Sequence, residues 1–214
     1  MFVIGITGGT GAGKTTVLNA LRSLGALVLD CDAIYHELLA ESNELRTELG
    51  LRFPGAVHNG AIDRKLLGEI VFSDPSALRD LNTITHGFIG VEIENRLSEW
   101  EDHGGVIAAI DAIALIESGR SKTCDAVVGI IAPAEARAQR IMKRDGITRE
   151  QAELRINAQK PEIFFRENCD HILANTYNSP EEFEKKSKEF FTKLIGGNND
   201  AGQRRLILQE KEHI

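Results

Sequence analysis

The chain has 214 residues, of which 42% are hydrophobic and 27% are charged, and its formal net charge is −7. This length is enough to bury a core in one domain, or in one domain that carries a large insertion. The negative charge disfavours nucleic acid as a partner, because such binding needs clustered lysine and arginine.

The spacing of the cysteines and the sequence at the start of the chain predict the cellular compartment of the protein. Cys31, Cys124 and Cys169 are far apart and form no CxxC pair, which is typical of a reducing environment. No stretch approaches the roughly 18 apolar residues of a membrane span. The first predicted strand runs directly into a glycine-rich loop, which argues against a signal peptide. We therefore expect a cytoplasmic protein without a membrane partner.

The first elements predict one strand–turn–helix–strand unit. Residues 2–6 are an apolar run that ends in glycines, as in a buried strand. Residues 14–24 place their apolar side chains on one helical face, and Gly25 is the expected stop. Residues 26–29 are a second apolar run. Such a βαβ unit is expected to be right-handed.

Residues 32 to about 102 have a helical pattern, with breaks at 53–55 and around 59–60. Asp74 and Pro75 mark a helix start, as the cap and the first helical position. A stretch of this length without a strand exceeds a single crossover connection. We therefore expect a helical insertion over residues 32–104 that covers or completes a site.

Alternation of strands and helices then resumes. Residues 105–110 and 126–131 are continuous apolar runs, typical of parallel strands buried on both faces. A helix is predicted over 133–144, and Thr148 with Gln151 forms a capping box for the next helix. Residues 171–174 predict a last strand and 179–182 the start of a last helix. The expected organisation is a nucleotide-binding core over 1–31 and 105–195, then a flexible linker and tail over 196–214.

Residues 8–15 read GGTGAGKT and fit the phosphate-loop pattern GxxxxGK[ST]. Glycines let successive backbone N–H groups turn inward around an anion, and the following helix directs its positive end at the same phosphates. Lys14 would reach the β- and γ-phosphates and Thr15 would bind Mg²⁺. The alternative is a glycine-rich turn that matches by chance. The residues expected to bind the nucleotide are Gly9, Gly11, Ala12, Gly13, Lys14, Thr15 and Thr16.

A phosphate loop alone does not distinguish hydrolysis from transfer. The guanine-reading string NKxD of switch GTPases does not occur in the chain. A small-molecule kinase needs an acceptor base and cationic groups near the γ-phosphate. Asp32 follows the second strand, where open α/β sheets place ligands, and could accept or orient a hydroxyl proton. Alternatively, Asp32 caps the helix that we expect to start at Ala33.

Cationic residues gather between 133 and 155. Arg137, Arg140 and Arg144 recur on one helical face, where like charges repel unless they meet an anion such as phosphate. Lys143, Arg149 and Arg155 extend this positive region. The alternative is a surface helix that tolerates its charges.

Two acidic residues follow the third predicted strand. Asp111 could hold Mg²⁺ through water, as could Glu117 six residues later. Either could instead cap a helix. On pattern alone, His86 is a residue on a helix face.

Four segments resemble the dephospho-CoA kinase family, and the resemblance runs from residue 2 to about 193. The first is LVLDCDAIYHELL, which is similar to the family's D-x-D segment. The others are GAIDRKLLGEIVFSDPSALRDLNTITH, similar to its acceptor-binding helical region, EARAQRIMKRDGITREQAELRINAQ, similar to its lid, and CDHILANTYN, similar to the stretch near its adenine site. Three positions depart from the family pattern: Gly87 replaces a proline after the histidine, and between the acids Ile113 replaces a proline and Ala114 a leucine.

The resemblance implies an α/β P-loop NTPase fold like that of nucleoside monophosphate kinases. It has a five-stranded parallel sheet flanked by helices, a helical CoA-binding insertion and a lid at about 140–160. The implied reaction is MgATP-dependent phosphorylation of the ribose 3′-hydroxyl of dephospho-CoA, the last step of coenzyme A synthesis. A kinase of another nucleotide or small metabolite, or a nucleotide-binding regulator without transfer activity, is the alternative. We expect a monomer or weak homo-oligomer.

The resemblance also implies roles for single residues. Asp32 acts as the base or orients the acceptor, and Lys14 and Arg140 assist catalysis. Arg140 and Arg144 approach the ATP phosphates from the lid. Asn175 lies beside the adenine. The residues that we expect to bind the acceptor are Asp32, Arg64, His86, Asp111 and Glu117.

Overall fold

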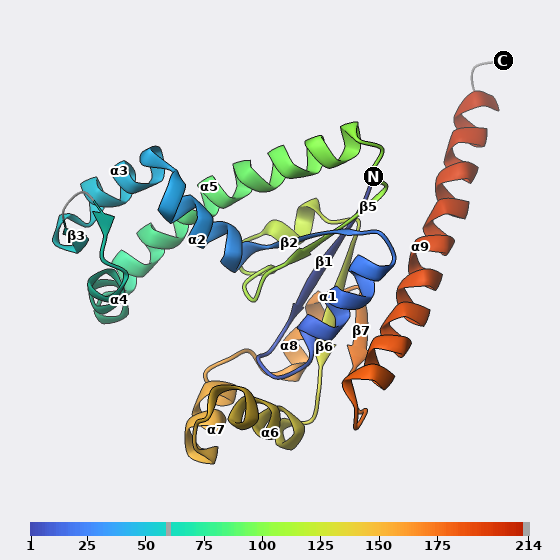
Figure 1. Ribbon diagram of the computed structural model, residues 1–214. Helices are drawn as coiled ribbons and strands as arrows, with labels where there is room; N and C mark the ends of the chain where they lie inside the picture. Colours follow the sequence, from blue (N-terminus) through green and yellow to red (C-terminus); the bar gives the residue numbers. More distant parts are fainter. Residues whose placement is uncertain (59–60, 212–214) are drawn as a thin grey trace. The chain divides into compact units, whose positions relative to one another are not determined.

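The computed structural model describes residues 1–58 and 61–211, and the side chains of residues 1–58 and 61–197. The chain divides into two compact units. One contains Met1–Val28 and Gly105–Ile214, and the other contains Leu29–Gly104. Figure 1 labels the elements of both.

The central feature is a five-stranded sheet. Its strands are β1 (Phe2–Gly8), β2 (Leu27–Asp30), β5 (Ile107–Asp111), β6 (Ala126–Ile131) and β7 (His171–Ala174). They lie in the order β2-β5-β1-β6-β7, and the pairs of β1 with β5, β1 with β6 and β6 with β7 are parallel. All residues of β6 are buried, as the continuous apolar run predicts for a strand covered on both faces.

The helices of this unit are α1 (Lys14–Ser23), α6 (Ala134–Asp145), α7 (Arg149–Asn157), α8 (Glu162–Asn168) and α9 (Pro180–Lys211), with a 3₁₀ turn, η2, at Arg120–Thr123. Helices α6 and α7 pack on each other. Helices α1 and α9 pack against each other, and α8 packs against β6 (Figure 1). The main core joins strands and helices through buried apolar side chains such as Ile4, Val17, Leu21, Val128, Phe183 and Phe191.

The last helix differs from the prediction. We expected a flexible linker over residues 196–202, but these residues lie within α9. A glycine inside a helix costs about 1 kcal/mol relative to alanine, whereas ending a helix and starting another requires a second unfavourable nucleation. The helix therefore continues through the glycines. Residues 212–214 of the predicted tail lie outside the described residues.

The second unit is mainly helical. Its helices are α2 (Cys31–Glu41), α3 (Asn43–Arg52), α4 (Arg64–Ser73) and α5 (Pro75–Asp102), with a 3₁₀ turn, η1, at Pro54–Ala56. Side-chain oxygens of Asp30, Ser42, Asp63 and Asp74 cap the four helices. A separate apolar cluster, which includes Leu45, Leu49, Phe53, Leu67 and Val71, forms its core.

A small ladder in this unit contradicts the expected absence of strands from residues 32–102. β3 (Val57–His58) and β4 (Ala61–Ile62) pair antiparallel, with Val57 opposite Ile62 and His58 opposite Ala61. Strands of two residues are too short to produce a periodic pattern. The break predicted around 59–60 lies outside the described residues. Within the described part of the chain, no helix is both long and apolar enough to cross a membrane.

Candidate active site

The phosphate loop connects β1 to α1 and contains three glycines with positive φ. Gly8, Gly11 and Gly13 have φ values of 144°, 78° and 108°. Such values turn the backbone N–H groups of consecutive residues toward one centre, which is how backbone amides form an anion site.

The N-terminus of α1 has no side-chain cap. Its N-cap is Gly13, which supplies no side-chain hydrogen bond, as is also true of the proline N-caps of α6 and α8, whereas α2, α3, α4, α5 and α7 each receive one. The first amides of a helix need an acceptor from outside the helix. A phosphate group at this position would supply the acceptor and would benefit from the helix dipole.

Three of the residues predicted to bind the nucleotide, Lys14, Thr15 and Thr16, form the start of α1. The Lys14 Nζ atom donates a hydrogen bond to the Gly8 carbonyl at 3.2 Å, so the ammonium group lies across the loop. Thr15 is exposed and Thr16 is half-buried. The ammonium group is therefore held at the loop where phosphates would bind.

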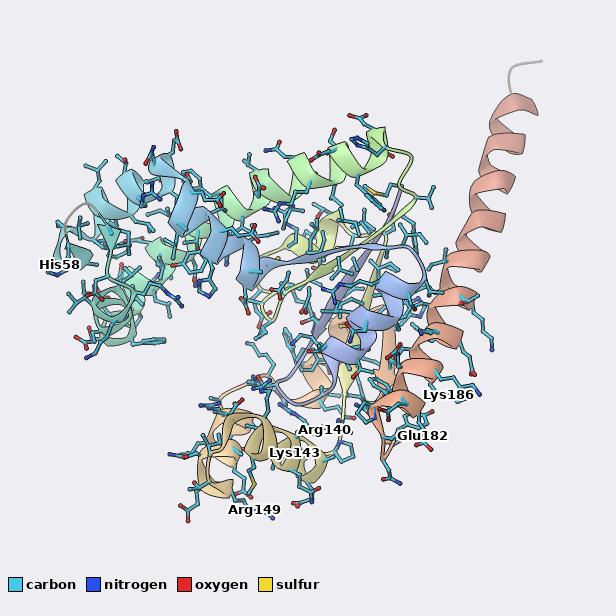
Figure 2. All side chains as sticks on the ribbon, viewed as in Figure 1. His58, Arg140, Lys143, Arg149, Glu182 and Lys186 are labelled. Atoms are coloured by element: carbon cyan, nitrogen blue, oxygen red, sulfur yellow. The ribbon has the colours of Figure 1, made fainter. Side chains whose placement is uncertain are left out.

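Arg140 and Asn175 meet the loop together, although they lie on different elements. The buried Asn175 amide donates from Nδ2 to the Ala12 carbonyl at 2.9 Å and accepts from Arg140 Nη2 at 3.3 Å. Arg140 Nη1 donates to the Gly11 carbonyl at 3.2 Å. Burial lowers the pKa of Arg140, but an arginine remains charged at physiological pH. The structure thus brings these two predicted residues to the loop; Figure 2 labels Arg140 on α6.

Gly13→Ala is expected to weaken ATP binding by at least about tenfold, since φ of 108° is strained for alanine and the new Cβ would lie 2.4 Å from Asn175 Nδ2. Isothermal titration calorimetry measures this. Gly25→Ala is the matched control, because Gly25 also has a positive φ, 83°, but open space around its Cβ position. An equal loss of affinity in both variants would contradict the prediction.

Arg144, the second arginine predicted to reach the phosphates from the lid, has different contacts from Arg140. Its Nε and Nη2 atoms donate to the Asp145 carboxylate at 2.6 and 3.0 Å, and its side chain is 61% exposed. The hydrogen bond to Asp145 raises the pKa of Arg144. Arg155 also binds Asp145, at 2.5 Å. The structure therefore joins Arg144 to a lid carboxylate and does not join it to the phosphate loop.

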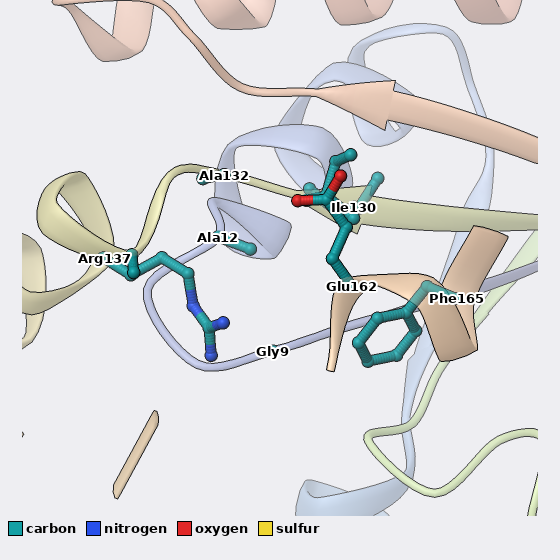
Figure 3. Close-up of a pocket in the computed structure, with 9 residues that line it drawn as sticks. Gly9, Ala12, Ile130, Ala132, Arg137, Glu162 and Phe165 are labelled. Carbon is teal, nitrogen blue, oxygen red and sulfur yellow. The ribbon is translucent and has the colours of Figure 1, made fainter. Parts of the chain in front are cut away.

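Two side chains that we did not assign to the loop contact it directly. Arg137 Nε donates to the Thr10 carbonyl at 2.9 Å, and Gln159 Oε1 accepts from the Thr10 amide at 2.9 Å. The sequence places Arg137 on one helical face with Arg140 and Arg144 and predicts that it meets phosphate, whereas its Nε atom binds the Thr10 carbonyl. Gln159 ends the lid-like segment, and a single neutral residue gives no periodic or charge signal. Figure 3 shows Arg137 reaching from α6 toward the loop at Gly9.

A cavity of about 180 Å³ lies beside this contact. It is lined by the loop, by the end of β6 and by the first turn of α8, which supplies Glu162 and Phe165 (Figure 3). Its lining residues are Gly9, Ala12, Ile130, Ile131, Ala132, Ala134, Arg137, Glu162 and Phe165.

The two predicted acids after the third strand lie in different surroundings. Asp111 is the last residue of β5, where it is half-buried and in register with Ile6 of β1. Glu117 is exposed in the following turn. Neither Asp111 nor Glu117 is the N-cap of a described helix. The next helical element along the chain is the 3₁₀ turn η2, and its N-cap is Gly119. The Thr7 hydroxyl donates to the Ile113 carbonyl at 3.1 Å and so ties this segment to β1.

The structure shows whether Asp32, which lies in the second unit, caps a helix. Helix α2 begins at Cys31, and its cap is Asp30, whose Oδ1 atom accepts from the Asp32 and Ala33 amides at 2.9 and 3.1 Å. Capping by Asp32 is therefore wrong. Asp32 is exposed, and its carboxylate receives no hydrogen bond from a described residue. It remains available for chemistry.

The predicted acceptor residues Arg64 and His86 lie on separate helices of this unit. Arg64 is the first residue of α4, and its Nη2 atom is 3.5 Å from His36 Nε2. His86 is exposed on α5. Burial raises the pKa of Tyr35, which the charge of Arg64 partly opposes. Tyr35 and His36 lie in α2, within the segment LVLDCDAIYHELL, and the sequence alone predicts no role for either ring.

Asp30→Ala is expected to lower the free energy of unfolding by about 1 kcal/mol, because two amides at the start of α2 lose their acceptor. Urea denaturation of the parent and the variant measures this difference. Asp30→Ser retains a capping oxygen and should recover most of the stability. An alanine variant as stable as the parent would show that the cap contributes nothing.

Known proteins resemble this chain over most of its length. A sequence model of the dephospho-CoA kinase family matches residues 2–181. A dephospho-CoA kinase from Geobacter sulfurreducens is 35% identical over 195 residues, which cover 90% of this chain and 98% of that protein.

Solved structures agree with the fold described above. A crystal structure of a Thermus thermophilus protein has a TM-score of 0.76 and 35% identity, and the match covers 90% of this chain and 97% of that one. A shikimate kinase from Acinetobacter baumannii, at 19% identity and a TM-score of 0.52, shares the fold over 92% of this chain and 94% of its own. The predicted α/β P-loop kinase fold with a five-stranded parallel sheet is confirmed.

Proposed function

This chain belongs to the dephospho-CoA kinase family, and from that membership we propose how its own residues carry out the reaction. The enzyme transfers the γ-phosphoryl group of ATP to dephospho-CoA and produces CoA and ADP, the last step of coenzyme A biosynthesis. The acceptor is the ribose 3′-hydroxyl. Its oxygen forms the new bond to phosphorus as the bond between that phosphorus and the β–γ bridging oxygen breaks.

The observation that carries the proposal is the phosphate loop followed by a helix without a side-chain cap. The positive φ values of Gly8, Gly11 and Gly13 form a concave set of amides, and the start of α1 adds its own amides. Lys14 neutralises charge on the β- and γ-oxygens as the phosphoryl group moves. In this proposal the backbone amides of Gly9 to Thr16 hold the phosphates.

Asp32 is the proposed acceptor base. It accepts the proton of the 3′-hydroxyl, or orients that hydroxyl in line with the γ-phosphorus. The support is chemical: its carboxylate is exposed, and the capping role belongs to Asp30. Arg64 and His86 bind the acceptor, with Asp111 and Glu117 as further polar contacts. Arg64 supplies a guanidinium fork of the kind that binds phosphate groups of a CoA-like molecule.

Arg140 and Asn175 form the nucleotide side of the proposed site. Three hydrogen bonds fix the Arg140 guanidinium against Gly11, Asn175 and Tyr177, so its plane is held in one orientation. A fixed guanidinium favours contact with an adenine ring or a phosphate oxygen. Arg144 reaches the phosphates only after it exchanges its bond to Asp145 for a bond to ATP. The lid segment over about 140–160 would close in this way.

The residues present suit Mg²⁺ bound mainly through the nucleotide. Among the described residues, no group of three or more His, Cys, Asp or Glu side chains could hold a metal by itself. Mg²⁺ usually keeps waters and binds through one or two protein oxygens and the substrate phosphates. The Thr15 hydroxyl would be the protein ligand, and Asp111 would act through water. When bound, the ion neutralises charge on the β- and γ-oxygens.

We also expect the enzyme to act in the cytoplasm as a monomer or weak homo-oligomer, with no nucleic-acid or membrane partner. The net charge of −7 supports the absence of nucleic acid. Light scattering after size-exclusion chromatography would measure the oligomeric state.

The function is tested by measuring ADP formation with MgATP and a panel of acceptors. Dephospho-CoA should stimulate ADP formation strongly, and CoA itself should not, because its 3′-hydroxyl already carries phosphate. Phosphorus NMR of the product should place the new phosphate on the 3′-oxygen. Strong stimulation by another nucleotide, without stimulation by dephospho-CoA, would assign a different acceptor. Gly87 and Ile113, which depart from the family pattern, are the positions to examine in that case.

A further inference from the structure

The phosphate loop is held at Thr10 by two side chains from outside the loop. Gln159 Oε1 accepts from the Thr10 amide at 2.9 Å, and Gln159 Nε2 donates to the Thr10 hydroxyl at 2.6 Å. Arg137 Nε donates to the Thr10 carbonyl at 2.9 Å, and Arg137 Nη2 donates to Gln159 Oε1 at 2.6 Å. The amide, carbonyl and hydroxyl of Thr10 are all engaged. We refer to Arg137 and Gln159 as the Thr10 clamp.

The two members of the Thr10 clamp flank the lid segment: Arg137 precedes it and Gln159 lies near its end. Arg137 is in α6, and Gln159 follows Ala158, the C-cap of α7. The backbone from 138 to 158 therefore leaves the loop at one member and returns to it at the other. Figure 3 shows the Arg137 side chain extended from α6 to the loop.

The loop backbone is shaped for this contact. A Cβ atom on Gly9 would lie 2.3 Å from Arg137 Nη2 and 2.9 Å from Gln159 Oε1, so a larger residue at this position would displace the ends of both side chains. Burial lowers the pKa of Arg137. Among the described residues, Arg137 hydrogen-bonds to Thr10 and Gln159 and to no carboxylate. Partial burial of a guanidinium without an acid is unfavourable, so an ion pair does not account for its position.

A glycine-rich loop needs such support. Three of its residues have positive φ, and glycine can adopt many other conformations, so ordering the loop costs conformational entropy. Supports that order the amides before the ligand arrives remove this cost from binding.

We propose that Arg137 and Gln159 are positioning residues, which hold the phosphate loop in its nucleotide-binding shape through Thr10 and touch no reacting atom. The inference rests on the proposed function, in that the ligand of the loop is an adenine nucleotide. Loss of the clamp affects nucleotide binding and leaves acceptor binding unchanged.

The test uses Gln159→Met and Arg137→Met, which keep side-chain length and remove the hydrogen bonds to Thr10. Each is expected to raise the Kd for MgADP, measured without acceptor, and the KM for ATP by about tenfold. The KM for dephospho-CoA should stay within about twofold of the parent value. In the nucleotide-free protein, the Thr10 amide of Gln159→Met should exchange with solvent about tenfold faster by NMR, because that amide loses its acceptor.

Matched controls make the same chemical changes elsewhere. Gln139→Met removes a glutamine on α6 that donates to Glu135, and Arg22→Met removes an exposed arginine that donates to Asn19. Both should bind MgADP like the parent. Gln159→Glu keeps an acceptor for the Thr10 amide, so in this variant the amide should exchange as slowly as in the parent. This variant tests the hydrogen bond even where Gln159→Met folds poorly.

Unchanged MgADP affinity in well-folded Gln159→Met and Arg137→Met would overturn the proposal, and so would equal increases in the KM values of both substrates. Unchanged Thr10 amide exchange in Gln159→Met would overturn it independently of any ligand. A parent protein that binds MgADP but does not phosphorylate dephospho-CoA would contradict the acceptor assignment and leave the clamp result valid.

Discussion

Asp32→Asn is expected to lower kcat for phosphoryl transfer to dephospho-CoA by about 10²–10⁴-fold, the usual effect of removing a general base. Asparagine has the shape of aspartate but cannot accept the hydroxyl proton. The Asp32 side chain takes no part in the α2 cap, and asparagine keeps the backbone amide that donates to Asp30, so the substitution retains the hydrogen bonds of the helix start. The Kd for MgATP, measured by calorimetry without acceptor, should remain close to that of the parent.

Asp30→Asn is the control for this experiment. It makes the same change two residues earlier, and asparagine remains a good N-cap. Its kcat should stay within about threefold of the parent value. If Asp32→Asn turned over as fast as the parent, the base would have to be another residue, and the exposed carboxylate of Asp32 would have no catalytic part.

Lys14→Met is expected to reduce kcat/KM for ATP by about 10³-fold or more, because a fixed positive charge at transferring phosphoryl groups is among the largest contributions in such enzymes. Methionine preserves the length of the side chain and its packing. The variant also loses the hydrogen bond from Nζ to the Gly8 carbonyl. Steady-state ADP formation at varied ATP concentration measures the loss.

Lys188→Met is the matched control, since Lys188 forms an ion pair with Glu184 on α9 and lies in no proposed site. Both variants should unfold at temperatures close to that of the parent. A Lys14→Met enzyme that retained more than about a tenth of the parent kcat/KM would contradict a role for Lys14 in stabilising the transferred phosphoryl group.

The sheet could be predicted from sequence because its strands are continuous apolar runs, and β1, β5 and β6 are almost entirely buried. β6 and β7 occupy the predicted residues, and β5 ends one residue later, which makes Asp111 its last residue. The capping box of Thr148 and Gln151 is present. These features depend on nearby residues or on continuous apolar runs, and a single sequence shows both.

The features that were missed depend on contacts between distant residues or on very short elements. The contact of Gln159 with Thr10 joins positions that are remote in sequence, and a single glutamine carries no pattern. Helix α8 and the ladder of β3 and β4 are too short for a clear period. Asp30 and Asp32 are both good caps, and only the helix start at Cys31 distinguishes them.

The hydrogen bonds of Asn175 restrict which residues evolution can accept at this position. Its amide must donate to the Ala12 carbonyl and accept from Arg140 in the same buried space. Aspartate, the replacement most similar in shape, would place a carboxylate oxygen against that carbonyl, and a lost buried hydrogen bond costs about 1–3 kcal/mol. Few substitutions at Asn175 are therefore expected to be tolerated during evolution, although its side chain takes part in no bond-making step.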